Sequence, residues 1–478
     1  YLEGQDMWHL SGIHRDVYLY ATPKTFINDH YISTTNASTD ATSGTLNIAL
    51  TWSNREGASV TKNVKVKLLD ATGKVMKESE IQSVSISAGT ATSPKAASTT
   101  LLLPGLTGLT AWSAENPYLY TVVVNQLDAS GTEEMAFSTK YGFRNVKISG
   151  TQLLVNGKRV FIKGVNTATL LKDVTLMKRA NVNAIRTSHY PRQPKMYAMM
   201  DAFGLYCVNE ANVECHGNQG LASNSSWQTA ITDREVRMVR RDRNHPSVIV
   251  WSFGNESGAA SDFSTAKSEM QQYDTTRPYF YCNEDNLVSY SDLHSNMYPT
   301  VSGVLSKSSG YNGKPYFICE YAHAMGQAVG NLKEYWDVIE GSTGIIGGCI
   351  WDWVDQAICK PADLVNGIKM KNGFNNWVAG YDYNSTNGIN QGFQGNFLDN
   401  GLITPDRKWT SKLTEVKKVY QNVAFKGFSG KTLTIKNKNA FTNLNAYNLV
   451  WRVLQDGRLV EEDQVNIPSI SAGSTGTV

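Results

Sequence analysis

Between Val160 and Gln356 the sequence repeats one pattern eight times, a short apolar run that ends in polar residues. The eight runs cover residues 160–166, 182–191, 205–217, 248–257, 279–285, 291–299, 316–325 and 344–356. Helix-like text separates several of them, as in residues 170–180, where Leu170, Val174 and Met177 recur at helical spacing. Strand–helix alternation predicts a parallel sheet, and eight repeats in roughly 200 residues predict a closed (β/α)8 TIM barrel.

The segments on either side of these repeats are β-rich. Residues 25–145 are rich in Thr, Ser, Val and Asn and carry short alternating runs punctuated by Gly and Ser. This pattern is typical of an antiparallel, immunoglobulin-like β-sandwich of about 100 residues. After Tyr420 similar strand-like runs return, but they are too few to close a sandwich. We therefore assign residues 23–144 to a sandwich, 145–420 to the barrel and 421–478 to a partial second sandwich.

Composition excludes several classes of protein. The net charge is +3 with no basic run, so nothing indicates a nucleic-acid or anionic membrane partner. No stretch approaches the ~20 apolar residues of a membrane span. The six cysteines all lie between Cys207 and Cys359 without a CxxC pair, mostly in or beside apolar runs. We expect buried free thiols in preference to disulfides, and leave the compartment open between cytoplasm and periplasm.

The segment HPSVIVWSFGNESG (245–258) places an ionisable carboxylate, Glu256, at the tip of a buried strand. Glu320 stands at the end of the seventh run in the same way. In a (β/α)8 barrel the C-terminal ends of the strands meet at one face, where the chemistry is done. Two carboxylates facing each other there match glycoside hydrolysis, in which one protonates the leaving oxygen and the other attacks or activates water. The alternative is two unrelated turn carboxylates, and their shared placement favours the functional interpretation.

Polar and aromatic residues at neighbouring strand ends strengthen this hypothesis. They could donate hydrogen bonds to sugar hydroxyls or stack on pyranose rings: His189, Asn255, Tyr298, His323, Trp351 and Trp353. Any one of them is equally consistent with a structural role. Their convergence on one barrel face is harder to explain without a sugar ligand.

A metal site is a weaker expectation. Glu214 and His216 are two residues apart in NVECHG and so lie on one side of an extended segment near Glu256. Such a Glu-x-His pair with a further carboxylate can hold a divalent cation. Oxygen-rich ligation favours Mg²⁺ or Mn²⁺ over Zn²⁺.

With these residues in place, the sequence resembles the family 2 glycoside hydrolases, and among them the long bacterial β-galactosidases. The similarity runs from YLEGQDMWHLSGIHRDVYL at the start through NAIRTSHYP, GLYCVNEANVECHG, RDRNHPSVIVWSFGNESG, CEYAHAMG and GGCIWDWVDQ, in that order. NESG followed by CEYAHAMG is similar to the β-galactosidase branch, not to β-glucuronidases or β-mannosidases. The resemblance implies that residues 1–22 are a remnant of an N-terminal sugar-binding jelly-roll domain and that a C-terminal sandwich is missing.

The resemblance also implies a function, that of an exo-acting retaining β-galactosidase. Glu256 matches the general acid/base, and Glu320 matches the nucleophile that forms a covalent galactosyl-enzyme. Glu214, His216 and Glu256 match a Mg²⁺ site. The residues that match a sodium site beside the sugar are Asp6, Phe397 (through its carbonyl) and Asn400. Those that match substrate contacts are Asp6, His189, Asn255, Tyr298, His323, Trp351 and Asn400.

The sequence also departs from the family pattern. After Asn166 only residues 167–169 precede the helix, where the family has a His-bearing loop that reaches the substrate. Whether this is a true deletion stays open. A β-glycosidase of another glycone specificity is therefore an alternative, and a uronate pocket would need a cation, for which Arg186 and Arg192 are the nearby candidates. A second alternative is an inactive fragment that acts as a carbohydrate-binding or assembly module, and homo-oligomer formation is left open.

Overall fold

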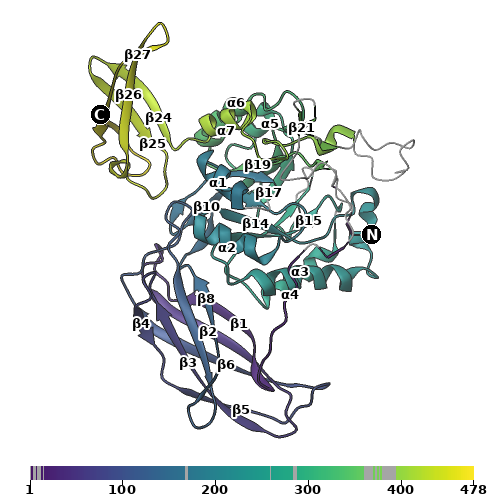
Figure 1. Cartoon of the computed structure of the whole chain (residues 1–478). Helices are drawn as coiled ribbons and strands as arrows, with labels where there is room; N and C mark the ends of the chain where they lie inside the picture. The colour runs from purple at the N-terminus through teal and green to yellow at the C-terminus, as the bar shows by residue number, and fades with distance from the viewer. Residues whose placement is uncertain are drawn as a thin grey trace.

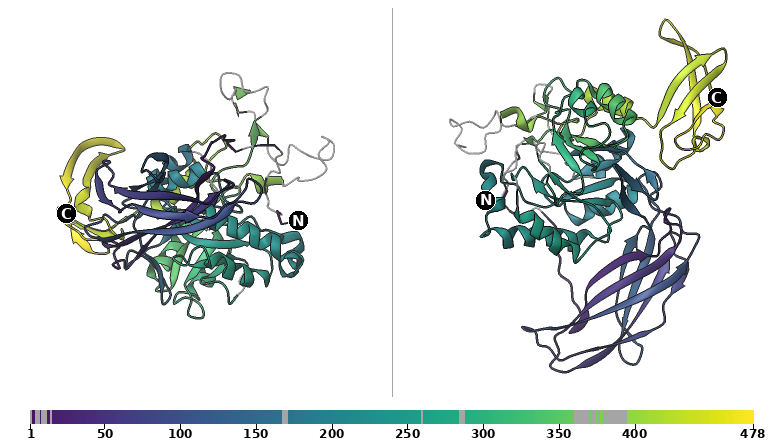
Figure 2. Two further views of the ribbon diagram at one scale, coloured as in Figure 1. Left: turned by 90° about the horizontal axis from the view of Figure 1, so that it is seen from below. Right: turned by 180° about the vertical axis from the view of Figure 1, so that it is seen from behind.

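The computed structural model describes residues 2–3, 7, 12–13, 15–166, 171–258, 260–283, 288–359, 370–371, 374–375, 377–378 and 395–478. A β-sandwich comes first in the chain, an eight-stranded barrel follows, and further small sheets come last (Figures 1 and 2). The predicted fold class is therefore confirmed.

The N-terminal sandwich consists of two antiparallel sheets. The first contains β1 (Thr25–Thr35), β2 (Gly44–Asn54) and β6 (Lys95–Leu106). The second contains β3 (Val60–Leu69), β4 (Val75–Glu78), β5 (Gln82–Ile86), β7 (Tyr120–Leu127) and β8 (Glu133–Tyr141). Burial along β7 alternates residue by residue, as expected for a strand with one face on the core.

The eight predicted barrel strands are all present and pair in parallel. They are β12 (Ile162–Asn166), β13 (Ala184–Arg186), β14 (Tyr206–Glu210), β15 (Val248–Asn255), β16 (Tyr279–Cys282), β17 (His294–Met297), β18 (Tyr316–Tyr321) and β19 (Ile345–Ile350). All eight residues of β15 are buried. This agrees with its continuous apolar sequence, because a barrel strand is covered on both faces.

Helices cover the outside of the barrel. They are α1 (Leu171–Arg179), α2 (Pro194–Phe203), α3 (Gln228–Asp242), α4 (Asp262–Gln271), α5 (Val301–Leu305), α6 (Leu332–Gly341) and α7 (Ser411–Val419). Helix α2 begins with Pro194 and ends before Gly204, whose φ of +73° closes the helix in the left-handed conformation. The small sheet of β9 (Val146–Ser149), β10 (Gln152–Val155) and β11 (Lys158–Arg159) contributes Leu153 and Val155 to the same apolar cluster as barrel residues such as Phe280.

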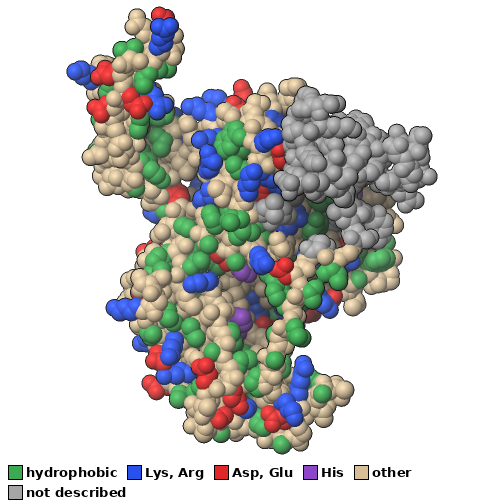
Figure 3. Space-filling model, viewed as in Figure 1, with side chains coloured by type: hydrophobic (Ala, Val, Ile, Leu, Met, Phe, Trp, Pro, Cys, Tyr) green, Lys and Arg blue, Asp and Glu red, His purple; other side chains and the backbone are tan. Residues whose placement is uncertain are grey.

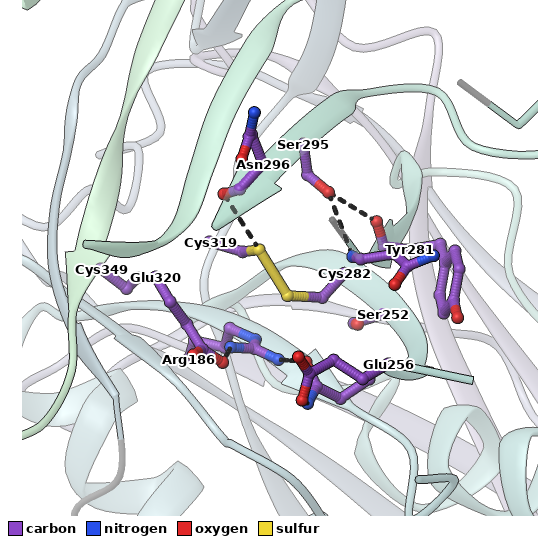
Figure 4. The surroundings of a disulfide bond; sticks show 12 residues. Arg186, Ser252, Glu256, Tyr281, Cys282, Ser295, Asn296, Cys319, Glu320 and Cys349 are labelled. Carbon is purple, nitrogen blue, oxygen red and sulfur yellow. Dashed lines mark hydrogen bonds and ion pairs between the residues drawn. A yellow bond between two sulfur atoms is a disulfide. The ribbon is translucent and has the colours of Figure 1, made fainter. Parts of the chain in front are cut away.

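The described hydrogen-bond ladder of the barrel runs β16-β15-β14-β13-β12-β19-β18-β17, which leaves a seam between β16 and β17. Serine hydroxyls bridge this seam: Ser295 Oγ donates to Tyr281 O (2.9 Å), and Tyr281 N donates to Ser291 Oγ (3.2 Å). A disulfide between Cys282 and Cys319 also crosses it, from β16 to β18 (Figure 4). The expectation of free thiols is therefore wrong for this pair, because the barrel brings two cysteines 37 residues apart to a Cα–Cα distance of 6.2 Å.

The other described cysteine side chains, those of Cys207, Cys215 and Cys349, are buried free thiols as expected. Cys359 lies in the short strand β20 (Ile358–Cys359), and its side chain is outside the described part of the structure. The other short strands after the barrel are β21 (Met370–Lys371), β22 (Phe374–Asn375) and β23 (Trp377–Val378).

The C-terminal part contains two small antiparallel sheets. Their strands are β24 (Val423–Ser429), β25 (Thr432–Asn437), β26 (Asn448–Gln455), β27 (Arg458–Asn466) and β28 (Thr475–Thr477). Ile435, Leu444, Ile467 and Ile470 form its small core. Glu115 ties this part to the N-terminal half of the chain by accepting hydrogen bonds from the backbone nitrogens of residues 440–442.

The surface carries mixed charge. On the face seen in Figure 3, basic and acidic side chains are interspersed over the described parts of the chain. Among the described residues, no helix is both long and apolar enough to cross a membrane.

Candidate active site

Glu256 lies directly beyond β15, and the backbone before it explains the sequence GNES. Gly254 has φ +151°, and a Cβ at this position would lie 2.3 Å from Val213 O, so only glycine lets β15 run this close to the preceding loop. Glu256 itself has φ +42°, a turn conformation that ends the strand. Its backbone nitrogen donates to Cys282 O (3.1 Å) in the neighbouring strand. The buried strand therefore ends in a turn that brings a carboxylate to the barrel mouth.

Glu320 lies in β18 and is 5% exposed. Its two carboxyl oxygens have different donors. Arg186 Nη1 donates to Oε1 (2.7 Å), and the Tyr298 hydroxyl donates to Oε2 (2.7 Å). These two bonds hold the carboxylate in one orientation.

Arg186 connects the two carboxylates, a role that the sequence did not reveal. Besides Glu320, its guanidinium donates to Asn255 Oδ1 (2.8 Å), and Asn255 Nδ2 in turn donates to Glu256 Oε2 (3.2 Å). Figure 4 shows Arg186 with Glu320 and Glu256 in the barrel interior. Only its position at the end of a predicted strand could have suggested such a role.

The charge of Arg186 is balanced mainly by Glu210, a second residue that sequence reasoning missed. Glu210 ends β14 and accepts two 2.8 Å hydrogen bonds from Arg186. Burial alone would raise the pKa of Glu210, but the charge of Arg186 and the hydrogen bond to His189 outweigh it and lower the pKa to about 2. Glu210 is therefore a permanent counter-charge beneath the site.

Asn255 also joins Glu256 to Glu214. Asn255 Nδ2 donates to Glu214 Oε1 (3.1 Å), so one carboxamide contacts both carboxylates. Burial and then the charge of Glu320 raise the pKa of Glu256. Burial raises the pKa of Glu214 to about 7, and the Glu256 charge adds to this effect. Asn255, which we expected to contact a sugar, is 1% exposed and orients the two carboxylates.

The other predicted sugar contacts surround these carboxylates. The His189 ring stacks on Trp351 (centroids 5.1 Å apart), while its Nδ1 lies 2.8 Å from Glu210 Oε1. Tyr298 and His323 have ring centroids 5.6 Å apart. Trp353, in contrast, is fully buried, so the expectation that it stacks on a sugar is wrong. Trp351 and Trp353 lie beyond the end of β19 in irregular backbone, so the rule that residues i and i+2 of a strand share one face does not apply to them.

The predicted magnesium ligands lie together at the mouth. His216 opens the 3-10 helix η1 (His216–Ser223), and its Nδ1 is 3.9 Å from Glu256 Oε2. Glu214 Oε2 is buried without a hydrogen-bond partner, an unfilled acceptor of the kind that a cation would satisfy. The described residues contain no group of three His, Cys, Asp or Glu side chains already arranged to hold a metal. The donor set fits Mg²⁺ in its chemistry, and coordination would need a side chain to move or water to complete it.

Two of the predicted sodium ligands are also adjacent. Phe397 lies in the short 3-10 helix η5 (Gly395–Leu398), and Asn400 follows this helix. Asn400 Nδ2 donates to Phe397 O (2.6 Å), and Asn400 Oδ1 is buried without a hydrogen-bond partner. Asp6, the third expected ligand, and the short loop at residues 167–169 lie outside the described residues. Near the start of the chain, Leu2 O accepts from Glu214 N (3.0 Å), so this segment contacts the candidate site.

Family models match three consecutive parts of the chain. The model of the glycosyl hydrolase family 2 TIM barrel domain matches residues 146–425, and the family 2 sandwich model matches residues 25–144. A model of domain 4 of β-galactosidase matches residues 433–478. The chain therefore belongs to family 2 of the glycosyl hydrolases.

Curated relatives extend this similarity over almost the whole chain. A β-galactosidase of Priestia megaterium is 34% identical over an alignment of 494 positions, which covers 97% of this chain and 46% of the relative. A β-galactosidase of Streptococcus thermophilus is 35% identical over 515 residues, covering 97% and 47% respectively. The chain thus spans about half the length of the curated relatives that it matches.

Solved structures agree with the fold. A β-glucuronidase of Bacteroides uniformis superimposes with a TM-score of 0.69 at 16% identity, covering 99% of this chain and 61% of that chain. One from Bifidobacterium dentium gives a TM-score of 0.58 at 20% identity, covering 83% and 67%. At these identities the likeness concerns the architecture alone.

Proposed function

We propose that this chain is the catalytic part of a retaining exo-β-galactosidase. The observation that carries the proposal is the continuous bridge from Glu320 through Arg186 and Asn255 to Glu256. It holds two carboxylates from different strands at one barrel mouth. Their environments differ, as two carboxyl groups with different tasks require. The identity of 34–35% to β-galactosidases supports galactose as the sugar.

In the proposed mechanism Glu256 begins protonated, which its raised pKa favours. It donates this proton to the glycosidic oxygen as the bond from that oxygen to the anomeric carbon breaks. A carboxyl oxygen of Glu320 bonds to the same carbon, and the aglycone leaves. Glu256, now ionised, takes a proton from a water molecule that attacks the anomeric carbon and frees Glu320. This mechanism needs the two carboxyl groups only ~5–5.5 Å apart.

Tyr298 and the Arg186 guanidinium supply the positioning of the nucleophile. Each donates to one oxygen of Glu320, so the carboxylate cannot rotate freely between the two steps. The tyrosine hydroxyl is also the natural donor to the carbonyl oxygen of the ester once Glu320 carries the sugar. His189, Trp351 and His323 would form the walls around the sugar ring.

We also propose that Glu214, His216 and Glu256 hold Mg²⁺, and that Asp6, Phe397 and Asn400 hold Na⁺. One oxygen each of Glu214 and Asn400 is buried without a hydrogen-bond partner, which supports this proposal. A bound Mg²⁺ would supply positive charge that offsets the repulsion among the buried carboxylates.

Within the described residues, both arginines that could have bound a uronate are engaged. Arg186 is held by Glu210 and Glu320, and Arg192 donates to Ser188 O, which favours a neutral sugar.

The test is covalent trapping with a 2-deoxy-2-fluoro-β-galactoside that carries a good leaving group. The fluorine slows hydrolysis of the intermediate, so the sugar should stay attached to the peptide that contains Glu320. Mass spectrometry of the digest identifies the labelled residue. Label on another residue would contradict the assignment of the nucleophile. No label, together with no turnover of a chromogenic β-galactoside by the folded chain, would contradict the proposed activity.

A further inference from the structure

The Cys282–Cys319 disulfide joins β18, which carries Glu320, to β16, the strand that pairs with β15 next to Glu256. Cys282 ends β16, and its carbonyl oxygen accepts the backbone hydrogen bond of Glu256 (3.1 Å). Cys319 directly precedes Glu320 in β18. Figure 4 shows the bridge in the same barrel interior as Glu256, Glu320 and Arg186.

The bridge matters because of where the barrel seam lies. Strands β15 and β16 are on one side of the seam and β17 and β18 are on the other. Through the backbone ladder, the connection from Glu256 to Glu320 runs the long way round, across β14, β13, β12 and β19. The short way crosses the seam, where the described contacts include a backbone hydrogen bond from Asp292 N to Tyr279 O (2.7 Å), hydrogen bonds of serine hydroxyls and the contact of the Phe280 and Phe317 rings. The disulfide adds a covalent link to them.

We propose that Cys282 and Cys319 are positioning residues, whose disulfide closes the barrel across its seam and sets the separation of Glu256 and Glu320. This inference rests on the proposed function for its catalytic consequence. Retention depends on a carboxyl separation of ~5–5.5 Å, and a displacement of about 1 Å can lower a rate 100-fold. A covalent bond across the seam restrains that separation more tightly than hydroxyl hydrogen bonds can.

The proposal makes the site sensitive to a dithiol reductant. Reduction breaks the S–S bond and adds two electrons and two protons, which the dithiol supplies as it becomes a cyclic disulfide. Cys319 Sγ lies 3.4 Å from Asn296 O, so a free Cys319 thiol could donate a hydrogen bond that a disulfide sulfur cannot. Reduction would therefore hold Cys319 against β17 while releasing Cys282 and β16. A chain that needs the bridge is also suited to an oxidising compartment.

The first experiment compares three proteins: the wild-type chain, Cys282→Ala and a matched control, Cys349→Ala. The control removes the same sulfur from the same interior cluster but breaks no disulfide. Peptide mapping without reductant should find Cys282 linked to Cys319. For an aryl β-galactoside, kcat should fall about 10- to 100-fold in Cys282→Ala, with KM within about twofold. Wild type equilibrated with dithiothreitol should fall likewise, and the control should retain most of its kcat.

A second measurement does not need activity. Hydrogen–deuterium exchange should be faster at the Glu256 amide and in residues 293–298 in Cys282→Ala and in reduced wild type, but not in Cys349→Ala. Free Cys282 and Cys319 in the peptide map, or unchanged kcat and exchange in Cys282→Ala, would overturn the proposal. Another outcome is slower exchange in oxidised wild type than in Cys282→Ala while oxidised wild type hydrolyses no galactoside. That result would support the structural role of the disulfide and contradict the proposed function.

Discussion

Arg186 Nη1 donates a 2.7 Å hydrogen bond to Glu320 Oε1, and both side chains are buried at the C-terminal ends of their strands. Burial alone would lower the pKa of Arg186, but the charges of Glu210 and then Glu320 outweigh it and raise the pKa. A guanidinium can serve both carboxylates at once because its donors form a planar fork. This one side chain therefore couples the candidate nucleophile to the buried charge below it.

Replacing the Arg186 guanidinium by an ammonium group should disrupt the site although the positive charge is kept. Arg186→Lys retains a cation, but an ammonium group is a point charge that cannot reach Glu210, Glu320 and Asn255 together. We expect kcat for an aryl β-galactoside to fall at least about 100-fold, and the stability to fall by about 3 kcal/mol because Glu210 loses its bidentate partner. Steady-state kinetics and urea unfolding measure the two effects. Wild-type kcat in a folded Arg186→Lys chain would contradict this role.

Replacement of Glu256 and replacement of Glu320 should lower turnover in different ways. Only the effect of replacing Glu256 should depend on the leaving group of the substrate. Glu256→Gln removes the proton donor, so turnover of substrates with poor leaving groups should fall about 10²- to 10⁴-fold. Bond cleavage with a dinitrophenyl leaving group, which needs little protonation, should fall far less. Glu320→Gln should abolish turnover of both substrates. Pre-steady-state release of the aglycone distinguishes the cases, and equal losses for both leaving groups in Glu256→Gln would reverse the assignment.

Tyr298→Phe tests the second donor to the nucleophile. The change removes one hydrogen bond to a charged group, worth about 1.5–3 kcal/mol, and leaves the ring in place. We expect kcat to fall about 10- to 100-fold. Tyr335→Phe is a matched control, because its hydroxyl donates only to the carbonyl of Pro299 (2.6 Å). A similar kcat loss in both variants would indicate a general structural effect.

Metal dependence can be checked by binding as well as by rate. Dialysis against a chelator should lower turnover, and added Mg²⁺ should restore it. Glu214→Gln removes a charged oxygen ligand, so Mg²⁺ should bind much more weakly to this variant in a calorimetric titration. Asp233→Asn, a loss of the same charge at an exposed helix position, serves as the control. Equal Mg²⁺ affinity in wild type and Glu214→Gln would exclude this site.

Acid stability should depend on Asp274, at the contact of the sandwich with the barrel. Burial alone would raise its pKa, but the charge of Arg277 and hydrogen bonds from Thr276 and Trp251 outweigh it and lower the pKa from 3.8 to about 2. A lowered folded-state pKa stabilises the fold above the unfolded value, and this stabilisation is lost as the pH falls through about 2. The shift corresponds to about 2 kcal/mol.

Urea unfolding of wild type and Asp274→Asn at pH 7, 4 and 2.5 measures this contribution. Asp274 Oδ2 accepts from Trp251 Nε1 (2.7 Å) and Arg277 Nη1 (2.6 Å), and an amide nitrogen in place of this oxygen cannot accept either bond or carry the charge, so the variant should be less stable at pH 7 and 4. The difference should narrow at pH 2.5, where the wild-type carboxyl begins to take up a proton. A difference that stays constant from pH 7 to 2.5 would mean that the charge of Asp274 does not contribute.

Much of the fold could be predicted from local patterns. Each of the eight predicted runs contains a barrel strand. Strands such as β15 begin with continuous apolar residues because both of their faces are covered, whereas β17 (His294–Met297) is mostly polar. Glu256 and Glu320 could be placed at one mouth because parallel strands in a barrel end at the same face. The glycine at position 254 is also explained by the structure, because a φ of +151° and the close approach to Val213 O suit only glycine.

Tertiary structure alone decided which side chains meet across that mouth. Nothing in the sequence around Arg186 shows that it would reach Glu210, Asn255 and Glu320, because those residues come from three other strands. Trp351 and Trp353 look alike in sequence, yet Trp351 stacks on His189 and keeps 5% of its surface exposed, whereas Trp353 is 0% exposed. Cys282 and Cys319 form a bridge because strands far apart in the chain converge inside the barrel. Local sequence governs which segments become strands, whereas contacts between strands depend on barrel closure, which no single segment encodes.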